Sequence, residues 1–267
     1  MMRFDFHTHT KASHDAFTSS QELLESCLLK NIEIIAVTEH DKSPALDNKD
    51  FIKEGIHLIK GCEFTTNKGV HIIGLFLDDF SIKDNSKEGI VSFIKSQDGI
   101  IIMPHPYKLE TGYLSVYGED SLIDKFHFIE LINGGIRKEF HYQDIMAIAK
   151  SHGLLMIASS DSHKCNQVGL CVTEIINSLS FSTSEELKKK LIALKQDEIR
   201  LLMDKSLIKL EGRRHNKIQK TSIYQELITK LPYLLKRIIK KISYKFSNNR
   251  SSKPANFEIF NLPSAND

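Results

Sequence analysis

The sequence predicts an α/β protein in which short strands and helices alternate around a barrel-like sheet. Seven apolar, β-branched runs recur along the chain, helical patterns separate most of them, and polar segments rich in histidine follow most of the runs. Several runs are almost continuously apolar, as expected for parallel strands covered on both faces. The repetition of strand, polar loop and helix is typical of a (β/α) barrel. The expected strands are residues 2–6, 32–37, 57–60, 70–77, 100–103, 128–131 and 154–158.

The helices are predicted from their apolar spacing and their capping residues. Ser19 or Ser20 caps the first helix, and Glu22 follows in its first turn. The third helix ends at Gly153, a residue type that favours the C-cap, and the last opens with Thr183 ahead of two acids that complement the helix dipole. The expected helices are residues 20–29, 88–96, 138–151 and 182–194.

The charge distribution divides the chain after about residue 211. Residues 212–267 carry 12 lysines and arginines against 3 acids, whereas residues 1–211 carry 24 against 31. This asymmetry indicates a basic extension attached to a mildly acidic main domain. We expect the main domain over 1–211, a linker over 212–222, a basic amphipathic helix over 223–246 that Pro232 starts or kinks, and a flexible tail over 247–267.

Cysteine use and hydropathy predict where the protein resides. The four cysteines form no CxxC pair, and Met1, Met2 and Arg3 lead directly into the first strand without a secretory leader. These features favour a cytoplasmic protein with free thiols. No uninterrupted apolar stretch reaches the roughly 20 residues that a membrane span needs. The expected basic helix over 223–246 is also compatible with peripheral association with a membrane surface.

Histidines and carboxylates occur at the ends of most of the expected strands. His7 and His9 alternate on one strand, so both side chains point to the same face, and Asp161 and His163 repeat this spacing after the last strand. Residues at the C-terminal ends of barrel strands project into one shared mouth. Their nitrogen and oxygen atoms suit Zn, Mn or Fe, and the lack of thiolates argues against a structural zinc site. The candidate ligands are His7, His9, His40, Glu63, His71, His105, Asp161 and His163.

Each of these residues also has an ordinary structural explanation when it is taken alone. His71 inside an apolar strand suits a hydrogen-bonded core histidine, and His105 between two prolines suits a turn. Their occurrence in order, together with the two paired motifs, favours the metal site. The remaining histidines lack this context and are expected on the surface or on helix faces: His57, His127, His141, His152 and His215.

The motifs that contain these residues resemble those of the PHP family, named for polymerase and histidinol phosphatase. The matching segments are FDFHTHT at 4–10, AVTEHD at 36–41, GCEFT at 61–65, HIIG at 71–74, MPHP at 103–106 and SDSH at 160–163. The resemblance covers residues 2 to about 175, and its order and spacing make it specific. One departure is Glu39, where the family more often has Asp.

The resemblance implies a distorted seven-stranded TIM-like (β/α)7 barrel that holds three divalent metal ions at its C-terminal mouth, with Mn, Zn or Fe all compatible. It assigns His7, His9, Glu63 and Asp161 to one ion, and Glu63 with His71 and His105 to a second. The third ion would take His40, His163 and a side chain from the segment 13–15. Members with this spacing favour Asp15, and His14 is the alternative.

Metal-assisted hydrolysis of a phosphate ester is the chemistry that this ligand set predicts. Two ions that share a carboxylate at roughly 3.5–4 Å lower the pKa of a bridging water, and the resulting hydroxide attacks phosphorus without a covalent phosphoenzyme. We assign Glu63, Asp161 and His163 to the catalytic centre. Glu39 and Asp41 are expected either to orient the His40 ring or to be solvated strand-end carboxylates. Cations just beyond strand ends are candidates to bind the phosphate: Arg137 first, then Lys11, with Lys42 and Lys164 as alternatives.

The expected substrate is a nucleotide, a nucleoside bisphosphate or another small phosphomonoester, because the short spacing from Glu63 to His71 resembles the family branch that acts on nucleotides and short RNA. An exonuclease that uses the basic extension to hold RNA or DNA is an alternative, as is a phosphatase of the histidinol-phosphate or phosphotyrosine type. The helix 223–246 suits nucleic acid, an anionic membrane surface, a partner, or packing on its own barrel. A regulatory PHP protein without activity, bound to a membrane or a partner, is the non-enzyme alternative.

Overall fold

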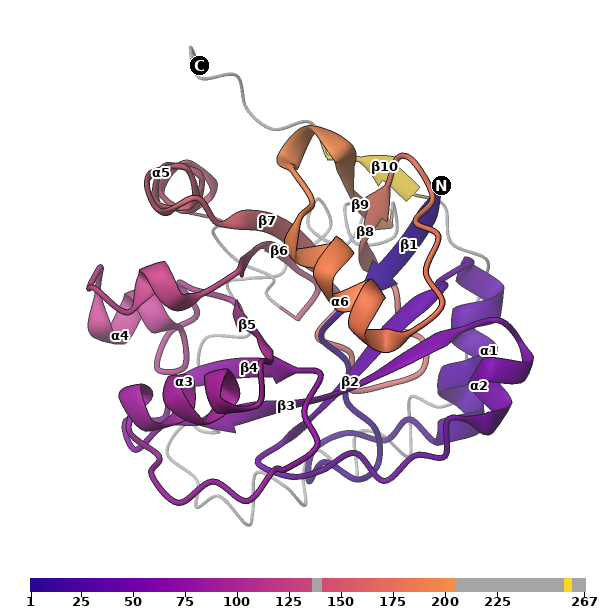
Figure 1. Ribbon diagram of the computed structural model, residues 1–267, viewed down its shortest axis with the longest axis horizontal. Helices are drawn as coiled ribbons and strands as arrows, with labels where there is room; N and C mark the ends of the chain where they lie inside the picture. Colours follow the sequence, from indigo (N-terminus) through magenta and orange to yellow (C-terminus); the bar gives the residue numbers. More distant parts are fainter. Residues whose placement is uncertain (136–140, 205–256, 261–267) are drawn as a thin grey trace, which may run out of the picture.

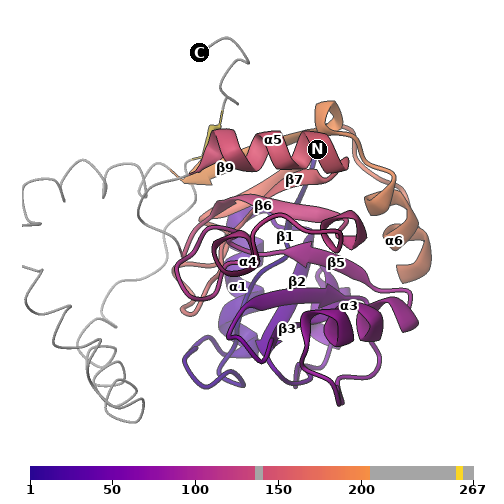
Figure 2. The ribbon, with the colours of Figure 1, turned by 90° about the vertical axis from the view of Figure 1, so that its left-hand side faces the viewer.

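Seven strands follow one another in chain order around a barrel-like sheet (Figures 1 and 2). The computed structural model describes residues 1–135, 141–204 and 257–260. A parallel bridge between Thr8 and Ser162 joins the chain beyond the first strand to the chain beyond the seventh, so the sheet nearly closes on itself. The seven strands are β1 (Met2–Asp5), β2 (Ile34–His40), β3 (His57–Thr65), β4 (His71–Leu75), β5 (Ile100–Met103), β6 (Phe128–Asn133) and β7 (Leu155–Ser159).

The strand–helix repeat is interrupted at β4. Strands β1, β2 and β3 are parallel to one another, as are β5, β6 and β7, but β4 is antiparallel to both of its neighbours. A short turn at Gly69, whose φ of 82° favours glycine, joins β3 directly to β4. A barrel-like α/β sheet is therefore confirmed, whereas an unbroken (β/α)7 repeat is wrong at this position.

Three further strands that the sequence analysis did not predict extend the sheet beyond β1. They are β8 (Cys171–Ile175), β9 (Ile199–Asp204) and β10 (Phe257–Ile259), and each pairs antiparallel with its neighbour. Residues 257–260 lie inside the stretch expected to be a flexible tail, and here β10 instead pairs with β9. The predicted linker 212–222, the basic helix 223–246 and Arg137 lie outside the described residues.

Six α-helices and two 3-10 helices, η1 (Ile123–Lys125) and η2 (Gln196–Glu198), lie in the described part of the chain. Ser19 caps the first one as expected, because its side chain accepts from the Glu22 N–H and the Glu22 carboxylate accepts from the Ser19 N–H at 2.8 Å. Two short helices, α2 and α4, were not predicted, and α5 begins later than the predicted residue 138. The α-helices are α1 (Ser20–Lys30), α2 (Lys49–Lys53), α3 (Lys87–Ser96), α4 (Tyr113–Tyr117), α5 (Tyr142–His152) and α6 (Ser184–Ile192).

The strands are buried on both faces, and β2 shows how. Ile34 and Ala36 belong to the large core inside the barrel, while Ile35 and Val37 face a second cluster that includes Leu23 of α1. Full burial of one such aliphatic side chain contributes about 1.5–3 kcal/mol. This packing explains why the strands have continuous apolar runs rather than alternating ones.

Helix α6 lies across the end of the barrel where the strands begin. Its Ser184 hydroxyl lies 3.3 Å from the His57 ring at the start of β3, and its Lys188 ammonium lies 2.6 Å from Asp98, just ahead of β5. Figure 1 shows this helix in front of the sheet. The C-terminal ends of the parallel strands therefore lie on the side opposite α6, where the polar loops that follow them lie. Within the described residues, no helix is both long and apolar enough to cross a membrane.

Candidate metal centre

Glu63 lies at the centre of a histidine cluster at the C-terminal ends of the strands. Its carboxylate is almost fully buried near the end of β3, and five imidazoles approach it within 3.4 Å. His71 and His105 face one oxygen, at 2.7 and 3.0 Å, and the other three rings face the second oxygen. The rings come from four different strand ends or loops: His7, His9, His40, His71 and His105.

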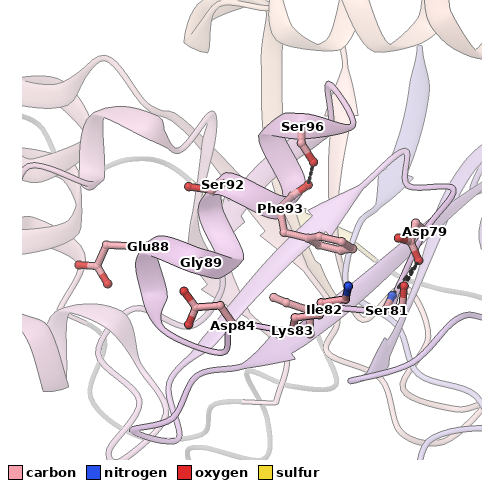
Figure 3. A pocket seen from close by; sticks show the side chains of 10 residues that line it. All are labelled: Asp79, Ser81, Ile82, Lys83, Asp84, Glu88, Gly89, Ser92, Phe93 and Ser96. Carbon is pink, nitrogen blue, oxygen red and sulfur yellow. Dashed lines mark hydrogen bonds between the residues drawn. The ribbon is translucent and has the colours of Figure 1, made fainter.

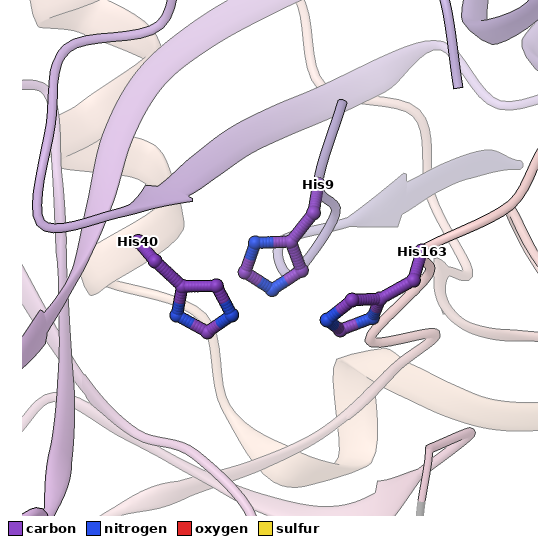
Figure 4. Close-up of side chains that lie close together, drawn as sticks. All are labelled: His9, His40 and His163. Atoms are coloured by element: carbon purple, nitrogen blue, oxygen red, sulfur yellow. The ribbon is translucent and has the colours of Figure 1, made fainter. Parts of the chain in front are cut away.

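Asp161 brings a second carboxylate to the same cluster. Its Oδ1 atom lies 3.4 Å from the His7 ring, 3.6 Å from the His9 ring and 3.6 Å from the His163 ring. Among the residues that the structure describes, four overlapping groups of three side chains have ligand atoms close enough to hold one ion, and one of them consists of His9, His40 and His163. Figure 4 shows these three rings turned toward one common space. The structure therefore brings together eight of the nine residues predicted as ligands in overlapping groups.

Asp15 is the ninth. Its carboxylate lies 3.5 Å from His40 Nε2 and 3.3 Å from His163 Nε2. His14 is exposed, and its ring centroid is 5.2 Å from that of His40. The position of Asp15 between two candidate ligand rings makes it a better-placed candidate than His14 for the third ion site that the resemblance implies.

The chemistry of this donor set fits a polynuclear cation site. One carboxylate has about four acceptor positions, yet five imidazoles face Glu63. The Nε2 atoms of His7 and His9 lie 3.1 Å apart, and the buried Nδ1 of His105 has no hydrogen-bond partner. Buried polar atoms are normally satisfied. Cations among these rings would supply the positive charge and the partners that the side chains do not give one another.

The pKa values agree with a cluster built to bind cations. Burial alone would raise the pKa of Glu63, but His71 and His7 outweigh it and hold the pKa well below its ordinary value. Burial lowers the pKa of His40 to about 3, so its ring is neutral and able to act as a ligand. Although burial opposes it, the neighbouring carboxylates raise the pKa of His9 to about 9. Protons and metal ions compete for such rings, so metal binding should strengthen as the pH rises.

Glu130 is a functional candidate that the sequence analysis missed. It is buried on β6, and its Oε1 accepts from His7 Nδ1 at 2.9 Å. Its Oε2 accepts from the His105 N–H at 2.8 Å and from the Asn133 side chain at 2.7 Å. A carboxylate that accepts the Nδ1–H of an imidazole leaves Nε2 free for a metal. The available signal was one acid inside the apolar strand 128–131.

Glu39 and Asp41 both accept hydrogen bonds from backbone N–H groups near the mouth; Glu39 is not solvated, whereas Asp41 is an exposed strand-end carboxylate, as one of the two expectations had it. Glu39 is buried, and its carboxylate accepts from the Thr10 N–H and from the hydroxyls of Thr10 and Ser13. Ser13 Oγ in turn accepts from the His40 N–H and lies 3.4 Å from His9 Nδ1. Asp41 accepts from the Thr65 N–H at 2.6 Å. Both carboxylates therefore fix loop backbone around the ligands rather than the His40 ring itself.

Two of the candidate ligands have backbone angles that side chains rarely adopt. His105 has a φ of 31° and Asp161 a φ of 49°. Such conformations cost on the order of 1–3 kcal/mol and cluster at functional sites. At both positions the bend follows the end of a strand, β5 or β7, where it redirects the side chain into the mouth.

Glycine at position 135 is required by the close approach of Asp161. A Cβ at this position would lie 2.5 Å from Asp161 Oδ2 and 3.1 Å from Asn133 Oδ1. We therefore expect Gly135→Ala to displace the Asp161 carboxylate and to lower metal affinity by about tenfold or more, as loss of a supporting contact does at other metal sites. Metal content after dialysis measures this. Full metal retention in the variant would contradict the tight packing of this loop against Asp161.

Two of the predicted phosphate-binding residues, Lys11 and Lys42, are exposed. Lys42 donates to the Ala12 carbonyl at 2.7 Å. Arg137, the first choice from the sequence, is outside the described residues. Lys108, which was not considered, lies 3.7 Å from Asp161 Oδ2. A separate groove of about 660 Å³ runs along α3 and the loop before it, and none of its lining residues belongs to the histidine cluster (Figure 3).

Two known proteins illustrate which sequences this chain is similar to. An uncharacterised protein of Methanocaldococcus jannaschii is 35% identical over 118 residues, which cover 40% of this chain and 68% of that protein. A probable phosphatase of Clostridium botulinum is 25% identical over 201 residues, which cover 62% of this chain and 80% of that protein.

Two solved structures resemble the fold. A two-domain protein of Bacteroides vulgatus, described as containing a PHP-like metal-dependent phosphoesterase, superposes with a TM-score of 0.55 at 21% identity, over 75% of this chain. This chain spans only 64% of that protein's length. The lesion-specific endonuclease Q of Pyrococcus furiosus superposes with a TM-score of 0.52 at 18% identity, over 73% of this chain and 56% of that one.

The family model of the PHP domain matches residues 5–251. This match includes every candidate ligand from His7 to His163 and most of the chain. The protein therefore belongs to the PHP domain family.

Proposed function

We propose that this protein is a metal-dependent phosphoesterase that hydrolyses small phosphate esters. The observation that carries the proposal is the position of Glu63, a single buried carboxylate within 3.4 Å of five imidazoles. A carboxylate whose two oxygens face separate groups of ligands is the arrangement that lets two cations share one anion. Asp161 and Asp15 add further oxygen donors on either side.

Cations held by these nine residues would activate a water as the nucleophile and neutralise charge on the phosphoryl oxygens. The chain's own residues supply the geometry. Glu130 holds His7 with Nε2 toward the cluster, and Ser13 contacts His9 on the loop that Glu39 fixes. Catalysis of this kind depends on preorganised charge, and a buried ligand set fixed by hydrogen bonds provides it.

A nucleotide, a nucleoside bisphosphate or another small phosphomonoester is the substrate class that we favour. The Clostridium botulinum relatives are named probable phosphatases, which supports a phosphomonoester over a diester. The nuclease alternative is supported by the shared fold with endonuclease Q; its proposed contact, the basic extension, lies outside the described residues. Histidinol-phosphate and phosphotyrosine substrates use the same chemistry and belong to the same test.

A substrate screen tests this proposal. Protein supplied with Mn, Zn or Fe is assayed against nucleotides, nucleoside bisphosphates, histidinol phosphate, phosphotyrosine, cyclic phosphodiesters and oligonucleotides. We expect phosphate release from a small monoester, and faster turnover there than on oligonucleotides. Faster cleavage of oligonucleotides, with a steep dependence on salt, would favour the nuclease instead.

Removal of metal gives the most direct prediction. Exhaustive chelation should abolish hydrolysis, and addition of one of the three metals should restore it, because the nucleophile and the charge neutralisation both depend on cations. Activity that survives chelation with no metal left by elemental analysis would contradict the mechanism. A protein that holds metal but releases phosphate from none of the substrates would support the regulatory alternative.

A further inference from the structure

We propose that Lys108 binds the phosphoryl group of the substrate at the metal centre. This inference rests on the proposed function, since it identifies a substrate contact of the same site. The carrying observation is that Lys108 Nζ lies 3.7 Å from Asp161 Oδ2, within the mouth that holds the candidate ligands. Within the described residues, no other lysine or arginine lies within ion-pair distance of Asp161 or Glu63.

A short turn after β5 places this lysine. The Lys108 N–H donates to the His105 carbonyl at 2.9 Å, and the Lys108 carbonyl accepts from the Gly112 N–H at 2.7 Å. A Cβ at Gly112 would lie 2.6 Å from the Lys108 backbone nitrogen, so glycine is required for this close turn. The lysine is therefore held three residues after a candidate ligand, with its side chain directed over the mouth.

The two oxygens of Asp161 have different neighbours. Oδ1 faces the rings of His7, His9 and His163 at 3.4–3.6 Å. Oδ2 faces Lys108 and the backbone of Gly135. The ammonium therefore approaches the oxygen of Asp161 that no described histidine contacts, and it does not compete with the histidines for the same oxygen. It can keep this position when Oδ1 acts as a ligand.

The ammonium group also keeps capacity for a further partner. At 3.7 Å the pair with Asp161 is too long for a hydrogen bond, and Lys108 Nζ donates no hydrogen bond to any described residue. Its side chain is 39% exposed, while Asp161 is nearly buried. The Lys108 side chain is thus close to the buried Asp161 carboxylate and also accessible to solvent, from which a substrate enters. A lysine has three N–H donors, and a phosphoryl oxygen is a strong acceptor for them.

Other cations on the rim fit this role less well. Lys42 donates to the Ala12 carbonyl and so ties two loops together. Lys11 is exposed, and no described carboxylate of the cluster lies within ion-pair distance of it. Lys108 alone among these combines proximity to the buried carboxylates with access to solvent.

The test compares Lys108→Ala, Lys108→Arg and Lys150→Ala with the wild type, all in the metal-loaded full chain. Lys150 is exposed on α5 and serves as a matched loss of one charge. Binding of inorganic phosphate is measured by calorimetry, which requires no turnover. We expect Lys108→Ala to weaken phosphate binding by about 10- to 100-fold, as expected for loss of a charge-assisted hydrogen bond. Lys108→Arg should recover most of the affinity, and Lys150→Ala should stay within about twofold of the wild type.

Metal content, the midpoint of thermal unfolding and the substrate KM separate binding from a structural role. The proposal requires Lys108→Ala to keep its metal and its thermal midpoint while KM rises more than kcat falls. Unchanged phosphate affinity with metal retained, loss of metal from Lys108→Ala, or no phosphate binding by the wild type would each overturn it. Wild-type protein that binds phosphate through Lys108 yet hydrolyses no ester would refute the proposed function and leave this contact standing.

Discussion

Glu63→Ala is expected to remove both the metal and the activity of this protein. The carboxylate is the shared neighbour of His7, His9, His40, His71 and His105. Without it, two of the proposed ion sites lose the one oxygen ligand that they share, and the cluster loses a negative charge that would offset the charge of the cations. Because loss of one preorganised electrostatic contact already lowers kcat by about 10²–10³, we expect a decrease of about a thousandfold or more. Elemental analysis after dialysis and steady-state rates measure the two effects.

Glu63→Gln sharpens this experiment, since the amide has nearly the same shape but neither negative charge nor two equal acceptors. It should lose metal nearly as completely as the alanine variant. Glu54→Ala is the control, because Glu54 is an exposed carboxylate at the end of α2, outside the mouth. A Glu63→Gln variant with full metal content and normal turnover would rule out a bridging role for this residue.

Glu130→Gln is expected to weaken metal binding by about 10- to 100-fold while the fold persists. Glu130 accepts from His7 Nδ1, from the His105 N–H and from the Asn133 side chain. A glutamine oxygen can still accept from His105 and Asn133, but its NH₂ group then faces His7. The His7 ring must then adopt the other tautomer, in which the proton is on Nε2 instead of Nδ1. Nε2 is the nitrogen that faces Glu63 and Asp161. A protonated Nε2 cannot act as a ligand.

Metal titration of the Glu130→Gln protein measures this effect, with circular dichroism to check the fold. Glu54→Gln gives the same chemical change on an exposed side chain. The effect should be larger on metal affinity than on the thermal midpoint of the metal-free protein. An undiminished affinity would show that His7 binds through Nδ1 or does not bind metal.

The regular parts of this fold follow from local patterns, and the irregular parts do not. A serine cap ahead of Glu22 and the burial of β2 on both faces are present in the structure as predicted, and of the two serines that could cap the helix the structure has Ser19. The apolar pattern of β4 does not reveal its antiparallel direction, because a strand buried on both faces has the same pattern in either direction. The available signal was the connection from β3, which is too short for a parallel crossover. β8 and β9 were missed since Thr173 and Glu174 interrupt the apolar run of β8 and Arg200 interrupts that of β9.

The candidate ligands were more predictable than their supporting residues. The candidate ligands follow strand ends, and two pairs of them share the same spacing of two residues. His7 with His9 and Asp161 with His163 could therefore be predicted from spacing alone. The contacts of Glu130 and Lys108 depend on how the curved sheet brings non-adjacent strands together, since each contacts a residue more than 50 positions away. The choice of Asp15 over His14 depended on where the loop places each side chain. Sequence spacing identified the segment 13–15 as the source of a ligand. The distances from Asp15 to His40 and His163 then favour Asp15 within that segment.

The pairing of β10 with β9 affects how the basic extension should be studied. Asp204 ends β9 and its Cα partner is Phe257, so the chain leaves the sheet at one residue and returns to it at a neighbouring one. Phe257 is also covered by the Arg3 guanidinium, 4.9 Å above its ring. A stop codon placed after residue 204 would remove β10, the outermost strand of the sheet. The backbone N–H and C=O groups of β9 that pair with β10 would then lose their partners. Replacing residues 205–256 with a short glycine–serine linker between Asp204 and Phe257 would remove the basic segment and keep β10 paired with β9.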